Sequence, residues 1–240
     1  MPPALLFDGL SLSIVLAGTA LATVLRSGRH ELVVTARAIA GLFAKRFSAV
    51  QAKADLAAQV SAIRRDGLLR ASTSAIGDRE FDDVTDVLIR SRSLDALIER
   101  HHDHRRNRIA AANAAVRTLA QAAELGPVFG MVGTLVSLSR LPATGLEQGA
   151  LSGAISMAVL TTLYGLLLAN LVLAPLARAV ERRSQDEERH RQEVIDWLSA
   201  QIEPALPSSL HPTSVSLVSG ASHGHGHGMR PQHGHGGTAA

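Results

Sequence analysis

The stretch LSGAISMAVLTTLYGLLLANLVLAPLA, residues 151–177, contains no charged side chain. A helix of this length rises about 40 Å, which exceeds the roughly 30 Å hydrocarbon core of a bilayer. We therefore predict that it spans a membrane. Two adjacent threonines, Thr161 and Thr162, lie in its middle, where hydroxyl groups need a hydrogen-bonding partner.

Two other stretches carry little or no charge. Residues 10–25, LSLSIVLAGTALATVL, have none, and residues 125–141, LGPVFGMVGTLVSLSRL, are interrupted only by Arg140. Together with residues 151–177 they predict an all-α membrane protein with three transmembrane helices.

The cations support this assignment and predict its orientation. Of 24 Lys and Arg residues, 17 fall between Arg26 and Arg117 and six follow from Arg178 onward. The positive-inside rule therefore places the N-terminus and the 142–150 connector outside, and the insert and the C-terminus in the cytoplasm.

Composition argues against several other classes of protein. The chain has no cysteine, so thiol catalysis and zinc–thiolate sites are excluded. The net charge of +3 is too small to suggest a nucleic-acid binder. His101, His102, Asp103 and His104 form the one cluster that an enzyme would need, but they lie on a charged helical stretch without a partner site. We predict no enzymatic activity, no cofactor and no metal site.

The insert between the first two spans has helical periodicity. Residues 30–69 and 80–102 predict amphipathic helices separated by a turn at 71–78, and residues 104–126 predict a helix that runs straight into the membrane. Residues 177–202 predict an equally long extension of the third span. Two long helices should therefore project into a helical cytoplasmic domain.

These features predict five regions along the chain. They are a first transmembrane helix (1–26), a cytoplasmic helical insert (27–122), a transmembrane hairpin (123–178), a cytoplasmic helical extension (179–206) and a disordered His/Gly-rich tail (207–240). Neutral imidazoles in the tail are able to bind a transition metal, but a tolerated polar tail is the preferred interpretation.

Small residues recur at helical spacing in the hairpin. One predicted stripe consists of Gly126, Gly130, Gly133 and Ser137, and the other of Ala158, Thr162, Gly165 and Ala169. Small residues allow membrane helices to approach closely. The hydroxyls of Thr134, Thr161 and Thr162 either bond to carbonyls of their own helices or contribute to a polar pathway.

The same segments carry a family resemblance. GPVFGMVGTLVSL (126–138) and MAVLTTLYGLLLANLVLAPLA (157–177) resemble the two signature helices of the MotA/TolQ/ExbB family. DGLSLSIVLAGT (8–19) resembles the MotA pattern Asp-x-Pro-Ser-Leu-Leu-Ile-Val-x-Gly-Gly-Thr, with Leu10 in place of proline and Ala17 in place of the first glycine. That pattern marks the second of four spans in MotA, and we expect no equivalent of the usual first span here.

The resemblance implies a homo-oligomeric ring of five copies in the bacterial inner membrane, around a one-span partner of the MotB/ExbD/TolR type. The three predicted spans contain no Asp, Glu, Lys or His, so the partner should supply an aspartate. The resemblance places Thr162 nearest the ion, assisted by Thr161 and Thr134. It assigns conformational coupling to Pro127, Pro175 and Tyr164, and helix packing to Gly126, Gly130, Gly133 and Gly165.

Positions at which this chain departs from the family patterns indicate whether it is closer to MotA or to ExbB and TolQ. ExbB and TolQ carry a glutamate where this chain has Met157, which favours the MotA branch. Arg64 and Gly67 match a rotor-facing pattern whose glutamate position is Ser72 here, so Arg64 is the predicted rotor contact. We expect an ion-conducting stator subunit for flagellar rotation. An ExbB/TolQ-like energising subunit and a non-conducting scaffold remain alternatives, and protons are expected over sodium only as the commoner coupling ion.

Overall fold

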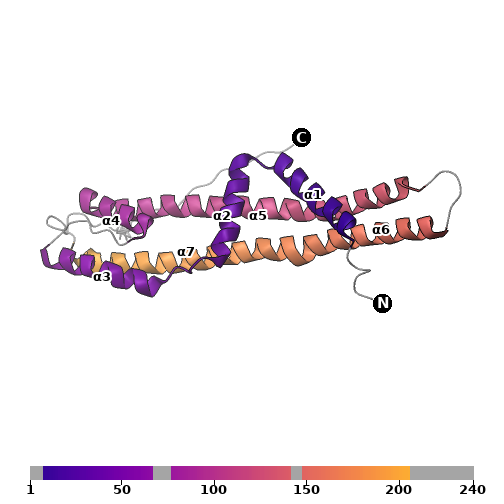
Figure 1. Cartoon of the computed structure of the whole chain (residues 1–240). Coiled ribbons are helices and arrows are strands. Elements are labelled where there is room, and N and C mark those ends of the chain that lie inside the picture. The colour runs from indigo at the N-terminus through magenta and orange to yellow at the C-terminus, as the bar shows by residue number, and fades with distance from the viewer. Residues whose placement is uncertain (1–7, 67–76, 142–147, 206–240) are drawn as a thin grey trace, which may run out of the picture. The chain divides into compact units, whose positions relative to one another are not determined.

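The computed structural model describes residues 8–66, 77–141 and 148–205, which form helices with no strand among them. Two long arms lie side by side and run in opposite directions (Figure 1). One arm is α5 (Leu94–Ser139). The other consists of α6 (Gln148–Leu167), a π-helical segment (Leu168–Leu173) and α7 (Ala174–Ile202).

The remaining helices pack against these two arms. They are α1 (Gly9–Arg26), which contacts α5 and α6; α2 (Arg29–Phe43), which crosses α5 and α7; α3 (Ala49–Asp66), which lies on α7; and α4 (Arg79–Ser91), which lies on α5. Three helical stretches are long and apolar enough to cross a membrane: Gly9–Arg26, Leu94–Ser139 and Leu151–Ile202. The predicted all-α, three-span membrane fold is confirmed.

The helix predicted over residues 30–69 is interrupted, which corrects the sequence interpretation. α2 ends at Phe43 and α3 begins at Ala49. In the gap, the Arg183 guanidinium donates to the carbonyl oxygens of Ala44 and Lys45 at 3.0 and 3.2 Å. The hydrogen-bond donor for these two carbonyls therefore lies on α7, far away in the sequence. Hydrophobic periodicity does not predict such a contact.

The helix predicted over residues 80–102 is also divided. α4 ends at Ser91, and Arg92 has a left-handed backbone with φ of 57°. Ser93 then caps α5, accepting a hydrogen bond from the Ala96 backbone N–H at 3.3 Å. The predicted turn at 71–78, apart from Gly77 and Asp78, and the predicted tail at 207–240 lie outside the described residues.

The third span runs into α7 as predicted, but it contains a π-helical segment, Leu168–Leu173, just before Pro175. The Ala174 N–H donates to the Ala169 carbonyl, five residues back. Proline lacks an N–H, and its ring clashes with the carbonyl four residues earlier. A wider turn accommodates both effects and keeps the helix continuous.

Most of the core lies where the helical insert packs against the C-terminal part of α7. Buried side chains of α3, α4, α5 and α7 gather around Leu56, Leu88 and Leu198, which are at most 1% exposed. The rings of Phe47 and Phe81 stack with centroids 5.7 Å apart. This core holds the ends of both arms together outside the predicted membrane region.

Candidate functional site: a glycine-packed membrane hairpin

The two membrane arms meet through glycines that leave no room for a side chain. A Cβ atom at Gly165 would lie 2.5 Å from the Gly126 carbonyl oxygen. A Cβ at Gly130 would lie 3.1 Å from the Thr161 carbonyl oxygen, and one at Gly133 would lie 2.6 Å from Thr161 Cγ2. The structure therefore places all four predicted packing glycines inside one hairpin, in a close backbone contact within a single chain.

The face of α6 that meets these glycines differs from the predicted one. The spacing had predicted a stripe of Ala158, Thr162, Gly165 and Ala169. The structure instead buries Thr161 with Gly165 and Ala169, and leaves Ala158 and Thr162 half-buried. Thr161 fills the space beside Gly133. Gly165 and Ala169 are therefore buried as predicted, but Thr161 takes the buried position expected of Thr162, because the pattern of one helix does not reveal where the glycines of its neighbour lie.

The three hydroxyls that the sequence singled out all donate within their own helices. Thr161 and Thr162 both donate to the Ala158 carbonyl, at 3.0 and 3.3 Å, and Thr134 donates to the Met131 carbonyl at 2.6 Å. Thr161 is 0% exposed, whereas Thr162 and Thr134 are half-buried. Each hydroxyl uses its hydrogen to donate to a carbonyl. Its oxygen lone pairs therefore remain free to accept a hydrogen bond or to bind a cation.

The first span is anchored to the hairpin at two points. The Asp8 backbone N–H donates to the Tyr164 hydroxyl at 3.2 Å. Gly18 lies so close to Phe129 that a Cβ there would be 2.2 Å from the ring. The Asp8 side chain caps α1, accepting from the Leu10 backbone N–H at 3.2 Å. Asp8 is part of the family resemblance of residues 8–19, and an aspartate just before an apolar run is also a recognisable N-cap signal.

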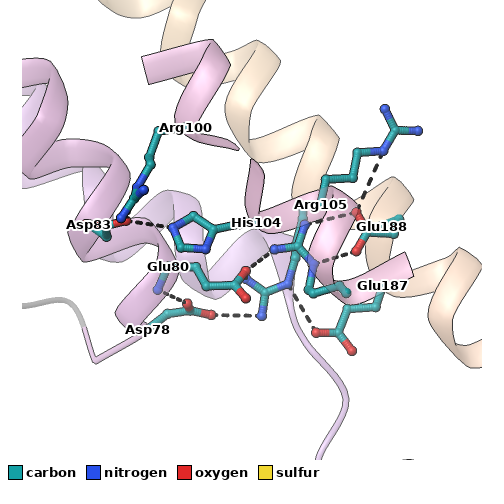
Figure 2. Close-up of polar contacts among 10 residues, drawn as sticks. Asp78, Glu80, Asp83, Arg100, His104, Arg105, Glu187 and Glu188 are labelled. Carbon is teal, nitrogen blue, oxygen red and sulfur yellow. Dashed lines mark hydrogen bonds and ion pairs between the residues drawn. The ribbon is translucent and has the colours of Figure 1, made fainter. Parts of the chain in front are cut away.

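Outside the predicted membrane region, a group of ion pairs joins α4, α5 and α7 (Figure 2). Arg108 on α5 pairs with Glu80 on α4 and with Glu188 on α7, whose Oε2 lies 2.9 Å from Arg108 Nη2. Arg191 on α7 pairs with Asp78 at 3.1 Å and with Glu80 at 3.2 Å. Arg191 is buried and the other charges are half-buried, and together they fix the insert against both arms. Their partners are far apart in sequence, so the sequence analysis missed them.

The histidine cluster has structural partners. His104 Nε2 lies 2.7 Å from Asp83 Oδ2, which also accepts from Arg100 at 2.6 Å. Figure 2 shows these three side chains together. The guanidinium of Arg100 is the main cause of the lowered pKa of Asp83. Among the described residues, no group of three His, Cys, Asp or Glu side chains is placed to hold a metal ion.

His101 is buried, and we predict that it makes stability depend on pH. Burial, together with the charge of Arg108, lowers its pKa from 6.5 to about 4. Glu188, Gln192 and His102 also surround the ring. Below pH 6.5 the His101 imidazole is protonated in the unfolded chain but stays neutral in the folded chain. The free energy of unfolding therefore falls as the pH decreases from 6.5 to about 4. At pH 5 the loss should be about 2 kcal/mol.

The check is thermal unfolding of the detergent-solubilised full chain at pH 7.5 and pH 5, compared with His101→Leu. The carboxylates of the ion pairs titrate in both proteins. The difference between their pH-dependent losses of stability therefore reports the contribution of His101 alone. Parallel losses of stability in both proteins would show that His101 contributes nothing.

Arg64, the predicted rotor contact, is exposed on α3. Its Nη1 donates to Gln201 Oε1 at 3.2 Å. Ser72 and Gly67, which complete the resemblance to a rotor-facing pattern, lie outside the described residues.

Three apolar spans, a hairpin packed through glycines and a helical insert outside the spans together place this chain among helical integral membrane proteins. The model of the MotA/TolQ/ExbB proton channel family matches residues 72–193, which is about half of the sequence and includes the hairpin. The chain belongs to this family.

The chain is similar in sequence and in structure to known motility proteins. Motility protein A of Cereibacter sphaeroides is 28% identical over 190 residues, covering 78% of this chain and 75% of the relative. Chemotaxis protein PomA of Vibrio alginolyticus is 35% identical over 77 residues, covering 32% and 30%. The flagellar MotAB stator complex from Bacillus subtilis superposes with a TM-score of 0.73 at 22% identity, covering 88% of this chain and 87% of that chain, and this likeness shows the fold.

Proposed function

We propose that the chain is an ion-conducting stator subunit that couples transmembrane proton flow to mechanical work in flagellar rotation. Family membership and a Motility protein A relative that spans most of the chain support this proposal. The observation that carries it is the half-buried Thr162 hydroxyl in a hairpin closed by glycines. Such a hydroxyl accepts a hydrogen bond or binds a cation, and it avoids the free-energy cost of placing a charged side chain inside the membrane.

The proposed pathway uses Thr162 and Thr134. Both residues are half-buried, so each remains partly exposed outside the contact between the two arms. Thr161 is sealed against Gly133 and enters the proposal as a packing residue. Because the three spans offer no acid of their own, the titratable group comes from a one-span partner that contributes an aspartate.

The proposed assembly is a ring of five copies around that partner, with the N-terminus outside and the C-terminus in the cytoplasm. Large apolar side chains on the outer faces of the hairpin support a role in contacts with neighbours and lipid. They include Met131, Leu135, Val159 and Leu171, which are 56%, 67%, 62% and 68% exposed.

Movement of the hairpin is proposed to involve Pro127, Pro175 and Tyr164. Pro127 removes a backbone donor inside α5, and Pro175 follows the π-helical segment. Tyr164 ties the first span to the hairpin through Asp8. Arg64, exposed at the far end of the insert, is the proposed rotor contact.

Deletion of the gene for this chain tests the function. The account predicts paralysed cells that still build flagella, with swimming restored by the wild-type gene. If swimming is unaffected and outer-membrane transport or envelope integrity fails instead, the ExbB/TolQ-like alternative is correct. Ser72, at the position of the rotor-facing glutamate, is the feature that favours that alternative.

A further inference from the structure

The connection between α2 and α3, residues 44–48, forms an elbow against α7. A cavity of about 430 Å³ opens beside it. Its apolar wall comes from Leu42, Phe43 and Phe47, and its polar wall includes Arg46, Arg182 and Arg183. The sequence analysis predicted an uninterrupted helix here, so neither the elbow nor the cavity was expected.

The arginines of this cavity are available for an external anion. Arg46 and Arg182 have no ion pair or hydrogen bond within the described part of the chain, and Arg183 uses its guanidinium on two backbone carbonyls. The acids in the wall have partners elsewhere: Glu187 lies 3.1 Å from Arg191, and Asp186 lies 3.9 Å from Arg189.

Three arginines of α5 and α7 behave differently. Arg100, Arg108 and Arg191 each pair with at least one carboxylate. The elbow therefore holds two guanidinium groups, Arg46 and Arg182, that have no partner in the described part of the chain. Arginine presents a planar fork of donors that binds phosphate oxygens in pairs, so the chemistry of the cavity favours a phosphate group.

The depth of the cavity fits a lipid headgroup. The uncharged run of the third span ends at Ala177, and Arg182 follows five residues later, about 8 Å along the helix. The headgroup layer on each side of a bilayer is about 7 Å thick. Phe43, which also lines the cavity, is 87% exposed, and aromatic rings are stable at this level of a membrane.

We propose that the elbow binds the phosphate of an anionic phospholipid in the leaflet on the side of the helical insert. Arg46 and Arg182 contact the phosphate, Arg183 holds the elbow in place, and the Phe43 ring enters the upper acyl region. The site fastens the C-terminal end of α2 to the membrane surface. It is independent of ion conduction, so either proposal stands or fails without the other.

Native mass spectrometry of the full chain, titrated with phosphatidylglycerol, tests this site. Each cation at an anionic surface is worth about fivefold in affinity, so Arg46→Gln/Arg182→Gln should weaken binding by about 25-fold. The matched control is Arg65→Gln/Arg92→Gln, which removes the same charge from two exposed positions of the insert and should bind normally. Arg46→Lys/Arg182→Lys should recover part of the loss.

Three results would overturn the proposal. The first is equal binding by the elbow variant and the control. The second is equal binding of phosphatidylcholine, or displacement of the lipid by millimolar inorganic phosphate, which would make the ligand a soluble anion. The third is a change in oligomeric mass in the elbow variant without loss of phosphatidylglycerol, which would mean that a second copy covers the cavity. Circular dichroism of each variant verifies that it is folded.

Discussion

Gly165→Ala is expected to destabilise the chain, whereas Gly153→Ala in the same helix is not. The new methyl group at residue 165 would lie 2.5 Å from the Gly126 carbonyl oxygen, a backbone atom that cannot rotate away. At residue 153 nothing lies within 4 Å. Both changes raise helix propensity equally, so their difference reports the contact alone. We expect a gap of about 2 kcal/mol, typical of overpacking.

Thermal unfolding in detergent, followed by circular dichroism, measures this gap, and Gly165→Leu should enlarge it. Motility supplies a second measurement, because a hairpin forced apart cannot hold its hydroxyls in place. Equal stability of the two alanine variants would mean that the arms do not approach as closely as the structure shows.

Thr162→Val is expected to reduce proton flux and swimming at least tenfold while the chain still assembles. Valine has the shape of threonine but cannot accept a hydrogen bond, and loss of a hydrogen bond to a charged group costs about 1.5–3 kcal/mol, which is roughly tenfold to hundredfold in rate. Thr162→Ser retains the hydroxyl and should retain most of the flux.

Thr161→Val is the matched control for this prediction. The Thr161 hydroxyl bonds to the same Ala158 carbonyl, but the side chain is sealed against Gly133. Flux within about twofold of wild type is expected, since a buried hydroxyl already satisfied by its own helix contributes little. If Thr161→Val abolishes flux and Thr162→Val does not, the pathway lies on the other face of α6.

The sequence was informative where one local property decides the structure. Residues 151–177 and 125–141 could be predicted as spans because length and apolarity alone define a bilayer-crossing helix. The glycines of α5 could be predicted as a packing face because Gly126, Gly130 and Gly133 recur at helical spacing.

The remaining features depend on contacts between distant residues. The break at Ala44–Ser48 depends on Arg183, and the burial of Thr161 over Thr162 depends on Gly133 of another helix. The pairing of Arg108 with both Glu80 and Glu188 joins three helices. None of these relations leaves a periodic signal in the sequence, so each needed the structure.

Proton flux into sealed vesicles is the most direct test of the central claim, which is that this hairpin conducts only when a partner contributes an acid group. Three preparations are compared: the chain alone, the chain with its one-span partner, and the chain with a partner whose membrane aspartate is changed to asparagine. The account predicts flux only in the second preparation. Flux through the chain alone, or undiminished flux with the asparagine partner, would contradict it.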